Sequence, residues 1–196
     1  MPSTVAPVQE MQTRERIVCT AARLMQRQGY EGTGIKLIAR EAKATLGSVY
    51  HFFPGGKKEL ALTAIAFSEK EFGDLLASSL ATENDPGAAM QACANTLAEY
   101  LAADGWADGC PVTATALETL DDPDMRAACE HAFAHWRGIV SEALVAGGVG
   151  EQDAQDLAYT VISVLEGAEL TAQVARSPKA LEVAGRHLVR LLGTYR

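Results

Sequence analysis

A short segment near the amino terminus concentrates the side chains best suited to binding a polyanion. Between residues 33 and 60 the chain carries hydroxyl, imidazole and ammonium groups at close spacing. Such groups bind phosphate oxygens and contact base edges in the grooves of DNA. The charge is distributed in the same sense: residues 1–60 hold nine Lys and Arg against five acids, and the remainder holds eight against twenty. A chain of net charge −8 therefore has a head of +4, which favours a nucleic-acid partner there.

Two short helices must position these side chains. Apolar residues at helical spacing predict one helix over residues 35–42 and a second over residues 45–52. Only Lys43 and Ala44 separate them, so the two helices must cross at a steep angle. This is the geometry of a helix-turn-helix unit.

Residues at the ends of these helices support the same interpretation. Thr33 and Thr45 are the expected N-caps of the two short helices, because threonine hydroxyls accept hydrogen bonds from free amides there. A preceding helix is expected to begin at Thr13 and to stop at Gly29. The run Pro54-Gly55-Gly56 ends the three-helix unit.

The rest of the chain is also helical in pattern, without the alternating runs of β-strands. Gly, Pro and Asp clusters divide it into six further segments, which makes nine helices in an all-α fold. The expected segments are about 57–81, 85–103, 112–120, 121–146, 150–176 and 177–196.

The segment Thr33–Leu60 resembles the signature of the TetR (tetracycline repressor) family. The resemblance rests on Gly47-x-Val49-Tyr50-His51-x-Phe53-Pro54, placed just after Ile38-Ala39-x-x-Ala42. It implies a three-helix helix-turn-helix domain at residues 1–56 and a helical ligand-binding and dimerisation domain at 57–196. Phe53-Pro54-Gly55-Gly56-Lys57 and Gly109-Cys110-Pro111-Val112 look like the branch of lincomycin and multidrug resistance repressors.

The resemblance also implies which residues meet double-stranded DNA. The second short helix would enter the major groove by its N-terminal end, and flanking groups would hold phosphates. The expected DNA-binding residues are Thr33, Lys36, Thr45, Leu46, Gly47, Ser48, Tyr50, His51 and Lys57. Two positions depart from the family pattern, which usually has Gly at Lys43 and often has Lys at Leu46. Lys43 must then either tolerate a left-handed backbone or reshape the turn slightly, and Leu46 offers an apolar contact to a thymine methyl.

The body is expected to dimerise and to bind a small hydrophobic or aromatic effector. The segment 151–196 is the expected homodimer interface, with stripes that include Leu157, Val161, Leu181 and Leu188. Apolar and aromatic residues with a few polar groups would line the effector site. These are Tyr100, Trp106, Cys110, Thr113, Leu117, Phe133, Trp136, Glu166 and Glu169. Either carboxylate, if buried, would need a partner such as a cationic ligand.

Three other interpretations remain open. His131 and His135, four residues apart and close to Cys129, have a spacing that binds metals, although no HExxH frame or other enzyme motif is present. Cys110 near a helix N-terminus would suit a redox-sensing regulator. A helical protein-interaction module is the third alternative. We expect no enzyme activity, no cofactor and no metal.

The compartment is predicted from what the sequence lacks. Four scattered cysteines without a CxxC pair fit a reducing cytoplasm, and no apolar run is long enough to span a membrane. Residues 1–12 are expected to form a polar, partly disordered tail, not a signal peptide.

Overall fold

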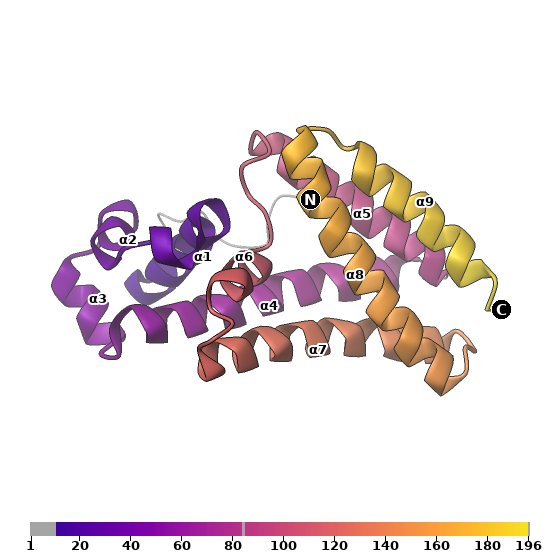
Figure 1. Ribbon diagram of the computed structural model, residues 1–196, viewed down its shortest axis with the longest axis horizontal. Coiled ribbons are helices and arrows are strands. Elements are labelled where there is room, and N and C mark those ends of the chain that lie inside the picture. Colours follow the sequence, from indigo (N-terminus) through magenta and orange to yellow (C-terminus); the bar gives the residue numbers. More distant parts are fainter. Residues whose placement is uncertain (1–10, 84, 196) are drawn as a thin grey trace. The chain divides into compact units, whose positions relative to one another are not determined.

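The computed structural model describes residues 11–83 and 85–195, and within them it forms helices and no strands. The prediction of an all-α chain is therefore confirmed, and the helices match the nine that the periodicity predicts (Figure 1). They are α1 (Thr13–Gly32), α2 (Ile35–Glu41), α3 (Leu46–Phe52), α4 (Gly56–Thr82), α5 (Pro86–Ala103), α6 (Pro111–Glu118), α7 (Pro123–Ala146), α8 (Glu151–Ala175) and α9 (Lys179–Gly193). The predicted tail lies mostly outside the described residues. None of the described helices combines the length and hydropathy that crossing a bilayer requires.

The chain divides into two compact units. The first contains residues up to Ser68 together with 111–129, and the second contains 69–110 together with 130–196. The long helices α4 and α7 each contribute residues to both units. The boundary expected between residues 56 and 57 does not coincide with the division into these compact units, and as a boundary between functions it stays a prediction.

The first unit is built on α1, which packs against α2, α3 and α6. Its core is apolar and includes Ile17, Ala21, Ile38, Val49 and Phe53, all at most 1% exposed. Burial of these side chains supplies the main stabilisation, because α2 and α3 have only seven residues each and are too short to be stable alone.

The second unit is centred on α5, α8 and α9, which lie side by side (Figure 1). The apolar stripe of α9, which includes Leu181, Ala184, Leu188 and Leu192, is buried within this chain. On α8 the residues Leu157, Val161, Leu165 and Ala172 are buried in the same way. The stripe residues that the sequence analysis assigned to the interface are therefore covered by their own subunit, and a homodimer through residues 151–196 stays a prediction.

The contact between α5 and α9 depends on small residues. A Cβ at Gly87 would lie 3.0 Å from the Cα of Val189 and 3.3 Å from its carbonyl oxygen, and both are backbone atoms. Because neither backbone relaxes easily, the two helices need a residue without a side chain at this point.

Replacing Gly87 by alanine should therefore lower the free energy of unfolding by about 1–3 kcal/mol through overpacking. Gly138 in α7 is a matched control, because a Cβ there would meet nothing within 4 Å. Gly138→Ala should instead stabilise by about 0.5–1 kcal/mol, since alanine favours the helix. Urea unfolding at one protein concentration measures both variants. Equal effects of the two substitutions would contradict the packing argument.

Candidate DNA-binding surface

The turn between α2 and α3 is closed by backbone hydrogen bonds around a left-handed residue. Lys43 has φ 50°, and the N–H of Ala44 donates to the carbonyl of Ala39 at 2.9 Å. The lysine thus adopts the left-handed conformation that glycine usually supplies, the first of the two outcomes that the sequence left open. Arg16 of α1 adds a hydrogen bond to the turn, since its Nε donates to the carbonyl of Ala42 at 3.1 Å. A basic residue of the head therefore holds the turn together.

The start of α3 is capped as the sequence predicts. Thr45 is the N-cap, and its hydroxyl accepts the Ser48 N–H at 3.0 Å. The two hydroxyl oxygens lie 2.8 Å apart, so the first turn of α3 presents a pair of linked donors and acceptors. Leu46, 40% exposed, and Gly47 complete an exposed surface at this end of the helix.

One face of α3 packs in the core and the other is exposed. Val49 and Phe53 are buried, whereas Tyr50 is 49% exposed and His51 is also exposed. Tyr50 is therefore not a core aromatic, and its hydroxyl is accessible to a partner. Lys36 and Arg40 project from α2 into solvent, with Arg40 paired to its neighbour Glu41 at 3.1 Å.

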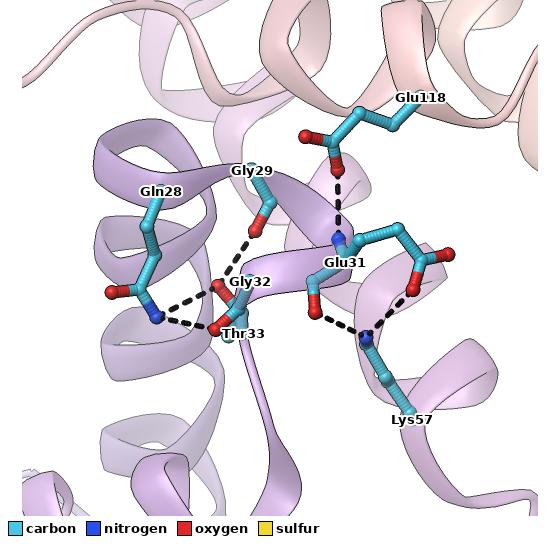
Figure 2. Close-up of polar contacts among 7 residues, drawn as sticks. All are labelled: Gln28, Gly29, Glu31, Gly32, Thr33, Lys57 and Glu118. Atoms are coloured by element: carbon cyan, nitrogen blue, oxygen red, sulfur yellow. Dashed lines mark hydrogen bonds and ion pairs between the residues drawn. The ribbon is translucent and has the colours of Figure 1, made fainter.

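Thr33 behaves differently from the sequence-based prediction. The prediction that it caps α2 is wrong, because Gly34 is the N-cap of that helix. The Thr33 side chain is fully buried, and its hydroxyl donates to the carbonyl of Gly29 at 2.7 Å (Figure 2). The cause is the break in α1 at Gly29, where φ is 74° and a free carbonyl results.

Lys57 is also held by the protein itself. Its ammonium lies 4.2 Å from the centroid of the Tyr30 ring. It also lies 3.4 Å from the Glu31 carbonyl oxygen, with the Glu31 carboxylate 3.8 Å away (Figure 2). The side chain is only 25% exposed. A phosphate contact by Lys57 would compete with these contacts.

Two carboxylates that the sequence did not single out organise the same region. Glu118 of α6 accepts the Glu31 N–H at 2.7 Å, and its carboxylate lies against Gly29, where it would collide with a Cβ (Figure 2). Glu59 accepts the Gly55 N–H at 2.7 Å before α4. The Glu59 contact could have been found, because it lies four residues from its partner, whereas the Glu118 contact spans 87 residues.

The predicted effector residues fall in both compact units. Thr113 and Leu117 belong to the first, and Leu117 is 70% exposed. The other seven belong to the second unit, and they are Tyr100, Trp106, Cys110, Phe133, Trp136, Glu166 and Glu169. A surface groove of about 680 Å³ between α7 and α8 includes Arg137, Glu142 and Tyr159 in its lining, and none of the predicted residues.

Trp136 is a core residue in this structure. It is fully buried, its indole N–H donates to the Glu69 carbonyl at 2.8 Å, and its ring meets Phe72 and Phe133 edge-on. Phe133 takes part in the same aromatic contact. The rings of Trp136 and Phe133 therefore stabilise the packing of α7 against α4 within the second unit.

The histidine pair singled out for metal chemistry meets a carboxylate. His135 Nδ1 lies 2.9 Å from Glu69 Oε1, and His131 Nε2 lies 3.5 Å from the same atom. Cys129 is buried and directs its thiol to the Val112 carbonyl at 3.8 Å. Across the described part of the chain, no three His, Cys, Asp or Glu side chains are grouped so as to hold a metal ion.

Comparison with known proteins gives two family matches. Residues 17–64 match the model of bacterial regulatory proteins of the tetR family. Residues 86–187 match the C-terminal domain of LmrA/YxaF-like transcriptional regulators. The HTH-type transcriptional regulator YxaF of Bacillus subtilis is 36% identical over 156 residues, which are 79% of this chain and 82% of that protein.

Solved structures share the fold over nearly the whole chain. A TetR transcriptional regulator from Legionella pneumophila superposes with a TM-score of 0.81 at 21% identity, covering 92% of this chain and 97% of the other. A cysteine mutant of the TetR-family regulator CifR, complexed with 26-bp operator DNA, gives a TM-score of 0.76 at 19% identity, covering 95% and 98%. The chain therefore belongs to the TetR family of bacterial transcriptional regulators, in its LmrA/YxaF-like branch.

Proposed function

We propose that this chain is a ligand-responsive repressor that binds a near-palindromic operator as a homodimer and leaves it when a small hydrophobic or aromatic effector binds. The observation that carries the DNA-binding part is the division of α3, with Val49 and Phe53 buried and Thr45, Leu46, Ser48, Tyr50 and His51 toward the surface. A helix of this kind reads the major groove by its N-terminal residues.

The homodimer part is supported by a second surface of α8. Tyr159, Ser163, Gly167, Leu170 and Val174 lie at intervals of three or four residues, so they share one face of the helix. All five are exposed, with Val174 at 80%, and none is charged. We call this face the α8 stripe. An uncharged exposed face suits a twofold contact with a second copy of the chain.

Binding to DNA from the chain's own upstream region, measured across a salt series, tests the proposal. Lys36→Gln should weaken binding and reduce the slope of log K against log salt by about one, because one phosphate contact is lost. Tyr50→Phe removes only a hydroxyl, so it should weaken binding by about tenfold without changing the slope.

Lys70→Gln is the matched control. Lys70 is an exposed lysine of the second unit paired with Asp74, so its loss changes the net charge as Lys36→Gln does. It should leave operator affinity close to wild type. Binding that is equally weak for operator and scrambled DNA, and unchanged by Tyr50→Phe, would contradict the proposal. Lys57 is unsuitable for this test because its contacts with Tyr30 and Glu31 make a substitution structural as well.

A redox-sensing regulator is a less supported alternative. None of the four cysteines is in a disulfide in the structure, and Cys93 and Cys129 are buried. Burial raises the pKa of the Cys93 thiol to about 12 and that of Cys129 to about 11, so both favour the unreactive thiol form. Only Cys19 and Cys110 are partly exposed, and thiol titration would test Cys110.

A further inference from the structure

Lys57 lies beside the surface that we propose for DNA binding. It follows Gly56, the first residue of α4. A Cβ at Gly56 would lie 4.0 Å from Cε1 of Tyr50 and 3.9 Å from Cδ1 of Ile35. The exposed Tyr50 and the start of α2 are therefore immediate neighbours of this position. A positive charge placed here favours a DNA backbone on that surface.

The ammonium group of Lys57 is nevertheless directed to the end of α1. Glu31 offers it two oxygens, the carbonyl at 3.4 Å and the carboxylate at 3.8 Å (Figure 2). The face of the Tyr30 ring lies 4.2 Å from the same nitrogen. A carbonyl at a helix C-terminus, a carboxylate and an aromatic face each attract a cation. The lysine must therefore give up attractive contacts within the protein when it turns to a DNA phosphate.

The backbone of Glu31 is fixed by contacts on both sides. Its N–H donates to the carboxylate of Glu118 at 2.7 Å, and the hydroxyl of Thr33 donates to the carbonyl of Gly29 at 2.7 Å (Figure 2). The carboxylate of Glu31, by contrast, is on the surface, with its side chain 73% exposed. An exposed negative charge at this place opposes the approach of a polyanion, in addition to its attraction for Lys57.

We propose that Glu31 competes with the DNA backbone for Lys57 and thereby limits the affinity of the head for DNA. In the free protein the two side chains are paired, and the pair opens when Lys57 binds a phosphate. The inference rests on the proposed DNA binding and adds a residue that acts against it. If Glu31 instead held Lys57 ready for a phosphate, its removal would have the opposite effect on affinity, so the sign of the effect distinguishes the two roles.

Glu31→Gln tests the proposal, because it keeps the shape of the side chain and the backbone contacts but removes the charge. Affinity for operator DNA should rise about two- to fivefold at about 50 mM salt, the range expected when an exposed ion pair no longer has to be broken. The gain should become smaller as salt is added, since ions screen the charge of Glu31. Scrambled DNA should gain by the same factor, because a phosphate contact carries no sequence information.

Two controls separate the pair from a general change of charge. Asp121→Asn removes one charge from another exposed acid of the first unit and should raise affinity much less than Glu31→Gln does. Lys57→Met removes the ammonium group and keeps the apolar stem against Tyr30. In that background Glu31→Gln should do no more than Asp121→Asn, because no lysine remains to be released; structural effects of Lys57→Met cancel in the comparison. Thermal unfolding checks that all variants are folded.

Operator affinity of Glu31→Gln at or below that of wild type would overturn the proposal. A gain no larger than that of Asp121→Asn, a gain confined to the operator, or one that persists in full with Lys57→Met would do so as well. The preference of the wild-type protein for operator over scrambled DNA separates this inference from the proposed function. If that preference exists and Glu31→Gln brings no gain, only the competition fails. If there is no preference, the proposed function fails whatever the variants show.

Discussion

Replacing Val174 by glutamate is expected to convert the protein from a dimer to a monomer and to weaken operator binding by about 10²–10⁴-fold. Val174 is the most exposed apolar residue of the α8 stripe, at 80%, and the partner's copy of the same face would meet it across a twofold axis. Two buried glutamates facing each other would repel and lose hydration. A monomer keeps one head, so it loses the gain in affinity that comes from joining two heads in one particle.

The measurements are sedimentation velocity and operator binding on the same samples. Leu120→Glu is the control. Like Val174, Leu120 is an exposed apolar residue, 56% accessible, but it belongs to the first unit and not to α8. It introduces the same charge and should leave the dimer intact. A Val174→Glu protein that remains dimeric would show that the α8 stripe is not the contact. A monomer that binds the operator normally would refute the need for two heads.

Sequence reasoning succeeded in the head because its determinants are local. The steep crossing follows from the two residues between the short helices, and the Thr45 cap acts on an amide three residues away. Burial of Val49 with exposure of Tyr50 follows from helical spacing alone. The left-handed backbone of Lys43 is one of the two outcomes that the sequence left open, because a residue other than glycine there must either adopt it or reshape the turn.

A local contact and a distant one explain what happens at Thr33 and Lys57. The hydroxyl of Thr33 turns back four residues to a carbonyl freed by the break at Gly29, so it does not cap α2. Lys57 contacts Tyr30 and Glu31 at the end of α1, and its contact with Glu31 spans 26 residues. The first contact depends on the break in α1 and the second on the packing of the unit, whereas the DNA contact expected of Lys57 stays a prediction.

The proposed dimer surface shows a second limit of prediction from the sequence. Periodicity correctly identified the apolar stripes of α8 and α9, but an apolar stripe packs equally well on its own subunit or on a partner. Here α9 lies on α5, with Gly87 permitting the close approach, so the stripe of α9 is used within the chain. The face left over on α8 is small and uncharged and not strongly apolar, which gives it a weak sequence signal.

Residues predicted for the effector site illustrate why core and pocket are hard to distinguish in a sequence. Both are apolar and aromatic, with few polar groups. Trp136 fits the description of a pocket residue, yet its indole N–H is satisfied by a backbone carbonyl and its ring is enclosed.

Replacing Trp136 by alanine should therefore reduce the free energy of unfolding by about 3–5 kcal/mol, which is a large part of the stability of an ordinary domain. The substitution empties a fully buried site and removes two edge-on contacts with Phe72 and Phe133. It also removes the donor to the Glu69 carbonyl, which ties α7 to α4 in the second unit. Urea unfolding at a fixed protein concentration measures the change, because dimerisation makes stability depend on concentration.

Trp136→Phe separates the packing contribution from the hydrogen bond. It keeps an aromatic ring in place but has no N–H, so it should cost clearly less than the alanine variant, about 1–3 kcal/mol. As the better-folded protein, it also tests whether Trp136 binds effector, by titration with the hydrophobic aromatic probe 2-naphthylmethanol. A core residue should change stability and leave probe affinity within about twofold of wild type, a difference below about 0.5 kcal/mol. A large loss of probe affinity with unchanged stability would instead make Trp136 part of the effector site, as the sequence alone suggested.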